Sequence, residues 1–120
     1  MIILHPVYYG RMRKSLLILL FFVSLGGVHK ASAQLDKHYF FYVGRSYIID
    51  NKFRDAIETL NVLLKVDEKA YEGYFLRGIA KYNLDDLLGA EQDFSYAIEN
   101  NPVFTAAYQY RAITRSRLGN

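Results

Sequence analysis

A single offset in sequence, the one from Gly44 to Gly78, relates many small and apolar residues of this chain to one another. Ala56 and Ala90 stand at the same offset, and Ala112 continues the glycine series. Large residues form two more series, Phe40, Tyr74 and Tyr108 in one and Leu60 and Phe94 in the other. A fixed period of this length indicates stacked supersecondary units. The sequence therefore predicts a repeat protein.

The apolar residues of the first period recur at helical spacing. They form one stripe between Phe40 and Ile48 and another between Phe53 and Leu64. Residues 50–52 interrupt the pattern, and the Asp-Asn pair there suits a short turn followed by a helix start. The first period therefore predicts a pair of helices.

The second period predicts the same pair. Helix-forming residues run from Tyr71 to Leu84, Asp85 and Asp86 provide a turn, and a partner helix runs from Leu87 to Asn100. That helix ends before Pro102, which cannot continue it. We therefore expect an all-α fold of antiparallel helix pairs, with repeats over residues 37–70 and 71–104 and a partial third repeat over residues 105–120.

Residues 1–33 have the three-part layout of a secretory signal peptide. A basic cluster at residues 11–14 precedes an apolar run over residues 16–23, and the small residues Ala31 and Ala33 end the segment. We expect cleavage between Ala33 and Gln34, which leaves a domain over residues 34–120. Met12 makes a cleaner start for such a signal than Met1. The expected location is the periplasm, the cell envelope or the medium of a bacterium.

An uncleaved membrane anchor is the alternative for this segment. A membrane-spanning helix needs about 20 apolar residues, and Ser24, Gly26 and Gly27 interrupt this run too early. We therefore expect contact with a membrane only through the transient signal. Because Gly26 and Gly27 belong to the signal, they do not predict a phosphate-binding loop in the mature protein.

The charge of the chain depends on the same segment. Four of its 15 basic side chains lie before Gln34, so 11 remain against 12 acidic ones, a net charge of −1. This balance argues against nucleic acid as a partner. The chain has no cysteine, which excludes a disulfide framework and a thiol nucleophile.

The repeated residues resemble the tetratricopeptide repeat, whose signature combines an aromatic residue, a leucine-glycine pair, a tyrosine, an alanine, an aromatic residue and a proline. The resemblance covers about residues 37–120. The positions that carry it, which we expect to pack the repeats, are Phe40, Gly44, Ala56, Leu60, Tyr74, Gly78, Ala90, Phe94, Pro102, Tyr108 and Ala112.

The chain departs from that pattern in both complete repeats. In the first, Leu63 stands where a small residue is usual and Glu68 where proline is usual. In the second, Arg77 replaces the leucine and Lys81 the tyrosine. The small residues remain, and they let paired helices approach closely while large residues fill the adjacent grooves.

The resemblance implies a solenoid whose concave side is lined by the first helix of each pair. Carrying the family's pattern onto this chain places a set of mostly aromatic and apolar residues in that groove: Phe41, Tyr42, Arg45, Phe75, Ile79, Tyr82, Gln109, Tyr110 and Ile113. Such a surface suits a peptide or helix laid in the groove. The apolar members have an equally simple alternative, which is burial in the core or under further repeats.

The family's clamp for acidic chaperone tails looks absent. It uses lysine, asparagine and arginine at fixed groove positions, and Phe41 and Phe75 occupy one of these positions in successive repeats. Arg111 and Arg115 share a helical face and suit a carboxylate. With Arg117, they equally suit a solvated face or pairing with the acidic second repeat.

Catalysis finds little support. The segment after Ala33 has one histidine, His38, and no spacing that suggests a catalytic triad. Asp85 and Asp86 form a carboxylate pair, but a turn that caps the next helix explains them. We expect no catalytic residue, no metal, no cofactor and no small-molecule substrate.

These patterns predict an exported scaffold of the tetratricopeptide type that binds a protein or peptide. One alternative is the structural N-terminal segment of a larger exported protein, with an assembly or enzymatic domain downstream. Another is self-association through the uncovered face of the last helix. Stacked repeats normally number three or more, so the partial third repeat favours a segment of a longer solenoid over a lone capping helix.

Overall fold

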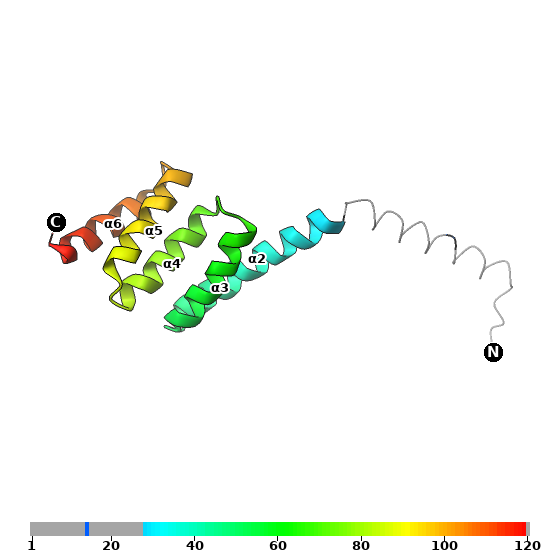
Figure 1. Cartoon of the computed structure of the whole chain (residues 1–120), viewed down its shortest axis with the longest axis horizontal. Helices are drawn as coiled ribbons and strands as arrows, with labels where there is room; N and C mark the ends of the chain where they lie inside the picture. Colours follow the sequence, from blue (N-terminus) through cyan, green and yellow to red (C-terminus); the bar gives the residue numbers. More distant parts are fainter. Residues whose placement is uncertain (1–13, 15–27, 120) are drawn as a thin grey trace. The chain divides into compact units, whose positions relative to one another are not determined.

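The computed structural model describes Lys14 and residues 28–119 of the chain (Figure 1). The chain divides into two units, Met1–Gln34 and Leu35–Asn120. Most of the predicted signal peptide lies outside the described residues. The second unit contains the predicted repeats.

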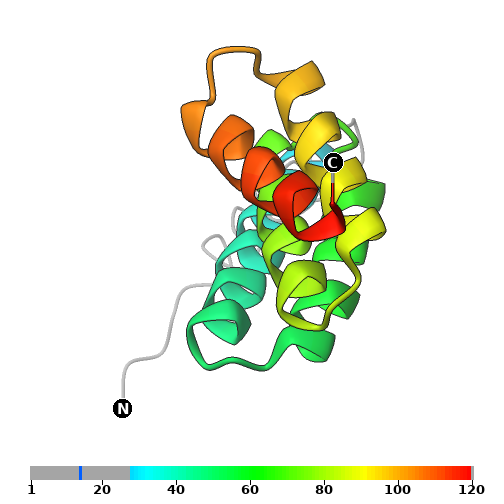
Figure 2. The same ribbon diagram turned by 90° about the vertical axis from the view of Figure 1, so that its left-hand side faces the viewer.

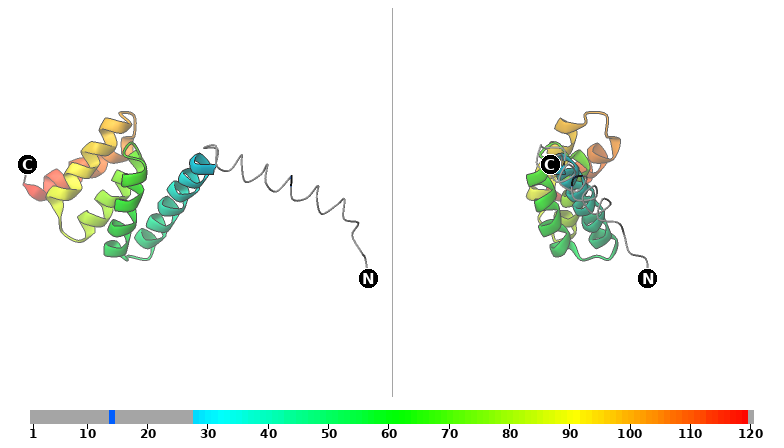
Figure 3. Two further views of the ribbon diagram at one scale, coloured as in Figure 1. Left: turned by 45° about the vertical axis from the view of Figure 1, so that its right-hand side comes forward. Right: turned by 90° about the vertical axis from the view of Figure 1, so that its right-hand side faces the viewer.

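Every regular element in the described part of the chain is an α-helix, which confirms the all-α prediction. Consecutive helices pack on one another in chain order, as Figures 2 and 3 show. The helices are α2 (Val28–Ile49), α3 (Phe53–Val66), α4 (Tyr71–Asn83), α5 (Leu87–Asn100) and α6 (Thr105–Leu118).

The first helix begins earlier than the sequence predicted. We expected it from about Lys37, but α2 starts at Val28 and runs through the predicted cleavage site after Ala33. Ala31 and Ala33 are strong helix formers, so nothing in this segment interrupts a helix. The other helices lie within a residue or two of their predicted bounds.

Positive φ angles recur at the period of the repeats. They belong to Asn51 (φ 58°), Asp85 (φ 65°) and Gly119 (φ 85°). Asn51 and Asp85 are the second residues after α2 and α4, and Gly119 is the first residue after α6. In the first two turns the next amide donates a hydrogen bond back to a carbonyl of the helix, Lys52 to Tyr47 at 2.8 Å and Asp86 to Lys81 at 2.9 Å. These bonds satisfy carbonyls that the helix end leaves free.

The next helix starts differently in the two turns. Asp86 is the N-cap of α5, and its Oδ1 accepts a hydrogen bond from the Gly89 amide at 3.0 Å. This contact agrees with the capping role that the sequence predicted. Lys52, in the equivalent place before α3, provides no side-chain cap.

The buried core of the pair α2–α3 is apolar. Ala56, Leu60 and Leu63 are buried at its centre, and half-buried aromatic and aliphatic residues of α2 cover them. Gly44 faces Leu60 so closely that an added Cβ would lie 2.7 Å from a methyl carbon of that leucine. The absence of a side chain at residue 44 therefore sets the distance between the two helices.

The pair α4–α5 uses the same close approach with a larger partner. A Cβ added at Gly78 would lie 2.7 Å from the ring of Phe94, which is completely buried. Ala90 of α5 is also completely buried. A separate small cluster of buried residues, Ala97, Ile98 and Ala107, joins α5 to α6.

A charged cluster lies inside the α4–α5 pair. The Asp93 side chain is completely buried and accepts hydrogen bonds from Arg77 Nε at 2.8 Å and Arg77 Nη2 at 2.7 Å. Lys81 Nζ lies 2.9 Å from the same carboxylate. Arg77 also donates to Asn61 Oδ1 of α3 at 2.8 Å, and its bonds to Asp93 raise the pKa of its guanidinium. Arg77 and Lys81, the two residues of α4 that depart from the repeat signature, therefore both pair with Asp93.

Candidate peptide-binding cleft

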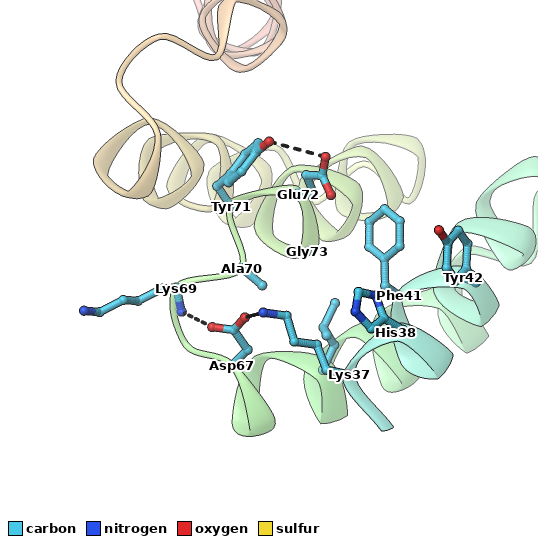
Figure 4. A pocket seen from close by; sticks show the side chains of 11 residues that line it. Lys37, His38, Phe41, Tyr42, Asp67, Lys69, Ala70, Tyr71, Glu72 and Gly73 are labelled. Carbon is cyan, nitrogen blue, oxygen red and sulfur yellow. Dashed lines mark hydrogen bonds and ion pairs between the residues drawn. The ribbon is translucent and has the colours of Figure 1, made fainter. Parts of the chain in front are cut away.

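An open cleft of about 300 Å³ lies between the middle of α2 and the start of α4 (Figure 4). His38, Phe41 and Tyr42 extend into it from α2, and the connection between α3 and α4 forms the opposite side. Its lining residues are Lys37, His38, Phe41, Tyr42, Leu63, Asp67, Lys69, Ala70, Tyr71, Glu72 and Gly73.

One wall of the cleft carries opposite charges. The Lys37 ammonium pairs with the Asp67 carboxylate, which also accepts a hydrogen bond from the Lys69 amide at 3.0 Å. The bond from Lys37 is the main reason that the pKa of the Asp67 carboxyl lies below its ordinary value. The carboxylate is therefore held in its charged form beside an ammonium group.

The other wall is aromatic. Phe41 is half-buried against the α2–α3 core, and its ring meets the ring of Tyr42 edge to face at 5.3 Å. Tyr42 is 62% exposed, so most of its ring is available to a ligand. An aromatic surface of this kind contributes large contact area with little loss of side-chain freedom.

Polar groups complete the rim of the cleft near the start of α4. The Tyr71 hydroxyl donates to Glu72 Oε1 at 3.4 Å, and the exposed His38 imidazole stands across from them on α2. Charged and hydrogen-bonding groups around an apolar floor can orient an extended peptide.

The predicted groove residues fall into separate places in the structure. Phe41 and Tyr42 line the cleft, while Arg45 is exposed one turn further along α2. Phe75 and Tyr110 pack on each other with ring centroids 5.3 Å apart. Their rings also contact Phe94, at 5.8 Å from Phe75 and 5.7 Å from Tyr110, so these two aromatic residues serve packing.

The remaining groove residues lie further from the cleft. Ile79 is half-buried, and the Tyr82 ring lies 4.6 Å beneath the Arg117 guanidinium. Gln109 is exposed and Ile113 is 50% exposed on α6.

The predicted packing residues also differ in their surroundings. Gly44, Ala56, Leu60, Gly78, Ala90 and Phe94 are buried, and Phe40 and Tyr74 are half-buried. Pro102, Tyr108 and Ala112 are exposed. The buried residues lie where two helices of one pair meet, whereas Ala112 lies on α6, which packs mainly on α5 and also contacts Phe75 and Tyr82 of α4.

Two of the arginines on α6 pair with acidic residues of the second repeat. Arg115 Nε lies 2.6 Å from Glu91 Oε1, and Arg117 Nη2 lies 2.8 Å from Asp85 Oδ1. This is one of the two structural alternatives that the sequence left open for the cluster. Arg111 differs, because it donates to the Ser95 hydroxyl at 3.2 Å and makes no ion pair with any described residue.

Sequence reasoning missed the charged wall of the cleft. Lys37 lies on α2 and Asp67 follows α3, and no spacing rule connects two residues of different elements. Asp67 follows α3 directly, and Tyr71 and Glu72 open α4. The one available signal was the concentration of charged residues in the short connection between these helices.

No protein-family model matches the chain, and no curated protein matches its sequence. Within the described residues, no helix has the length and apolar character needed to cross a membrane. The same residues contain no group of three or more histidine, aspartate or glutamate side chains arranged to hold a metal ion.

Proposed function

We propose that this protein is an interaction scaffold of the tetratricopeptide type that holds a peptide segment of a protein partner in the cleft between α2 and α4. The observation that carries the proposal is the combination of the exposed Tyr42 ring with the Lys37–Asp67 pair around one opening. Such a site takes an extended segment with an apolar or aromatic side chain next to a polar or charged group.

The period of the sequence supports the family part of this proposal. It appears in the positions of Gly44 and Gly78 against their partner helices and in the positive φ angles of the turns. A solenoid made of such pairs places the first helix of each pair on its concave side, and both α2 and α4 are first helices. Export under the N-terminal signal peptide is the second part of the proposal, and it rests on the sequence layout alone.

A peptide-display selection against the full chain tests the proposal. Peptides that it enriches should bind with micromolar dissociation constants by isothermal titration calorimetry. Tyr42→Ala should weaken this binding at least about tenfold, because a buried aromatic contact contributes about 1.4 kcal/mol or more. Phe41→Ala is a poorer probe, since Phe41 also packs on the core.

Tyr39→Ala is the matched control. Tyr39 lies on the same helix, has the same exposed fraction of 62% as Tyr42, and does not line the cleft. The control variant should bind as the unaltered chain does. Equal losses in the two variants, or the absence of any enriched peptide, would show that this cleft is not the binding site.

A further inference from the structure

The side-chain contacts of α4 recur on α6 at the offset that relates the repeats. The Tyr74 hydroxyl donates to the carbonyl of Glu68 at 3.0 Å, and the Tyr108 hydroxyl donates to that of Pro102 at 2.9 Å. In both helices an arginine lies over this tyrosine ring, with its Cζ 5.6 Å from the centroid. The tyrosine and the arginine therefore make equivalent contacts on α4 and on α6.

Arg77 and Arg111 also make equivalent hydrogen bonds to the helix that precedes their own. Arg77 donates to Asn61 of α3, and Arg111 donates to Ser95 of α5. Asn61 and Ser95 again stand at the offset of the repeats. One side of each guanidinium is thus occupied by an equivalent contact.

The other side of the guanidinium is where the helices differ. On α4, Arg77 and Lys81 hold Asp93 of α5, and the adjacent Phe94 covers Gly78. On α6, the equivalent residues are Arg111, Arg115 and Ala112. Ala112 is exposed, the Arg115 side chain is 45% exposed, and no described residue supplies a carboxylate to Arg111.

We propose that this face of α6 binds a helix of a protein partner that presents a carboxylate followed directly by an apolar side chain. The carboxylate pairs with Arg111, as Asp93 pairs with Arg77, while Arg115 stays paired with Glu91 of α5 and adds positive charge beside it. The apolar side chain lies on Ala112, as Phe94 lies on Gly78. The argument rests on charge complementarity with a template inside the same chain, and it is independent of the cleft between α2 and α4.

The methyl group of Ala112 limits the size of the apolar side chain that the partner can place there. A Cβ at Gly78 would come within 2.7 Å of the Phe94 ring, and Ala112 does carry a Cβ. A partner helix at the same separation should therefore present a side chain there that is smaller than phenylalanine or, like leucine, can change its rotamer to avoid the contact. We expect an aspartate or glutamate followed by leucine, valine or a smaller residue.

The test uses a helical peptide copied from residues 86–100, which include α5, with the change Phe94→Leu. A covalent staple on its solvent side removes the cost of helix nucleation. Its fluorescence anisotropy is measured with the full chain, next to a second peptide that also carries D93N. The aspartate peptide should bind about tenfold more tightly or better, because hydrogen bonds to a charged partner are worth about 1.5–3 kcal/mol.

Variants of the chain assign this binding to α6. Arg111→Ala should remove the difference between the two peptides, whereas Arg54→Ala, which changes an exposed arginine of α3, should preserve it. Arg111→Glu should weaken the aspartate peptide and strengthen a peptide with D93K. Thermal melting checks that the variants are folded.

Two results would overturn the proposal. If both peptides bind equally, or neither binds at millimolar concentration, the face does not recognise a carboxylate-bearing helix. If sedimentation shows that the full chain forms a dimer that dissociates in Arg111→Glu, a second copy occupies the face and the partner is not a different protein.

Discussion

The two complete helix pairs of this protein solve the same packing problem with different chemistry. In α2–α3, Gly44 allows close approach to Leu60, and the buried residues of the pair are apolar. In α4–α5, Gly78 allows the same approach, but a buried carboxylate and two cations lie beside it. The positions equivalent to Arg77 and Lys81 in the first pair are Val43 and Tyr47, and the position equivalent to Asp93 is Thr59.

This difference shows that the glycines set the distance between the two helices of a pair. The residues beside them differ between the pairs as a set, apolar in one pair and charged in the other. Arg77 and Lys81 each break the repeat signature when considered alone. With Asp93 they form one unit, because a buried carboxylate is tolerated only with paired charges and hydrogen bonds. Such a unit adds little net stability, since desolvation offsets much of the attraction between the charges.

The strongest test of the comparison removes the buried carboxylate. Asp93→Asn should lower the free energy of unfolding by about 3 kcal/mol, because Arg77 and Lys81 would keep their charges inside the pair without a counter-charge. The matched substitution in the first pair is Thr59→Ala, and its effect should stay below about 1 kcal/mol. Urea denaturation of the full-length variants measures both values.

An apolar triple variant separates the two explanations for such a loss. If the charges act mainly as a matched set, Arg77→Leu, Lys81→Tyr and Asp93→Leu together should cost far less than Asp93→Asn alone. A triple variant as unstable as the single one would mean that the ion cluster itself stabilises the fold.

The glycines give the next largest expected effect. Gly78→Ala should lower the free energy of unfolding by about 1–2 kcal/mol, because overpacking against a rigid ring outweighs a gain in helix propensity of about 1 kcal/mol. Gly44→Ala should cost less, since Leu60 can change its rotamer. Adding Phe94→Leu to Gly78→Ala should recover part of the loss, and equal costs at the two glycines would contradict this account.

The smallest expected effect concerns the charged wall of the cleft. The pKa of Asp67 in the folded protein lies below its ordinary value of 3.8, so its contribution to stability is present above that pH and is lost as the pH falls through the folded pKa. Lys37→Met should raise the pKa of this carboxyl, measured by NMR titration. At neutral pH it should change stability by less than about 1 kcal/mol, because both side chains contact solvent. An unchanged pKa would show that Lys37 does not hold the carboxylate.

The helices and the close-packing points could be predicted from the sequence, because both follow from the period of small and apolar residues. Gly44, Leu60, Gly78 and Phe94 needed only spacing and size for their prediction. The early start of α2 at Val28 could not be predicted in this way, since the signal-peptide pattern argued for a boundary at Ala33.

The cleft and the buried cluster needed information that spacing does not contain. Asp93 belongs to an acidic stretch that reads as solvated, and only the packing of α4 on α5 shows that it is completely buried. Phe75 illustrates the alternative that the sequence left open for the apolar groove residues, because it contacts the rings of Phe94, Phe104 and Tyr110. In each case the partner side chain, not the residue type, decides the role.

The hydrogen bonds between side chains connect positions close in sequence. Among the described residues, the widest separation of such a bond is 32 positions, between Arg117 and Asp85. Because little chain must be closed into a loop before these contacts form, folding should be fast and should start within either helix pair.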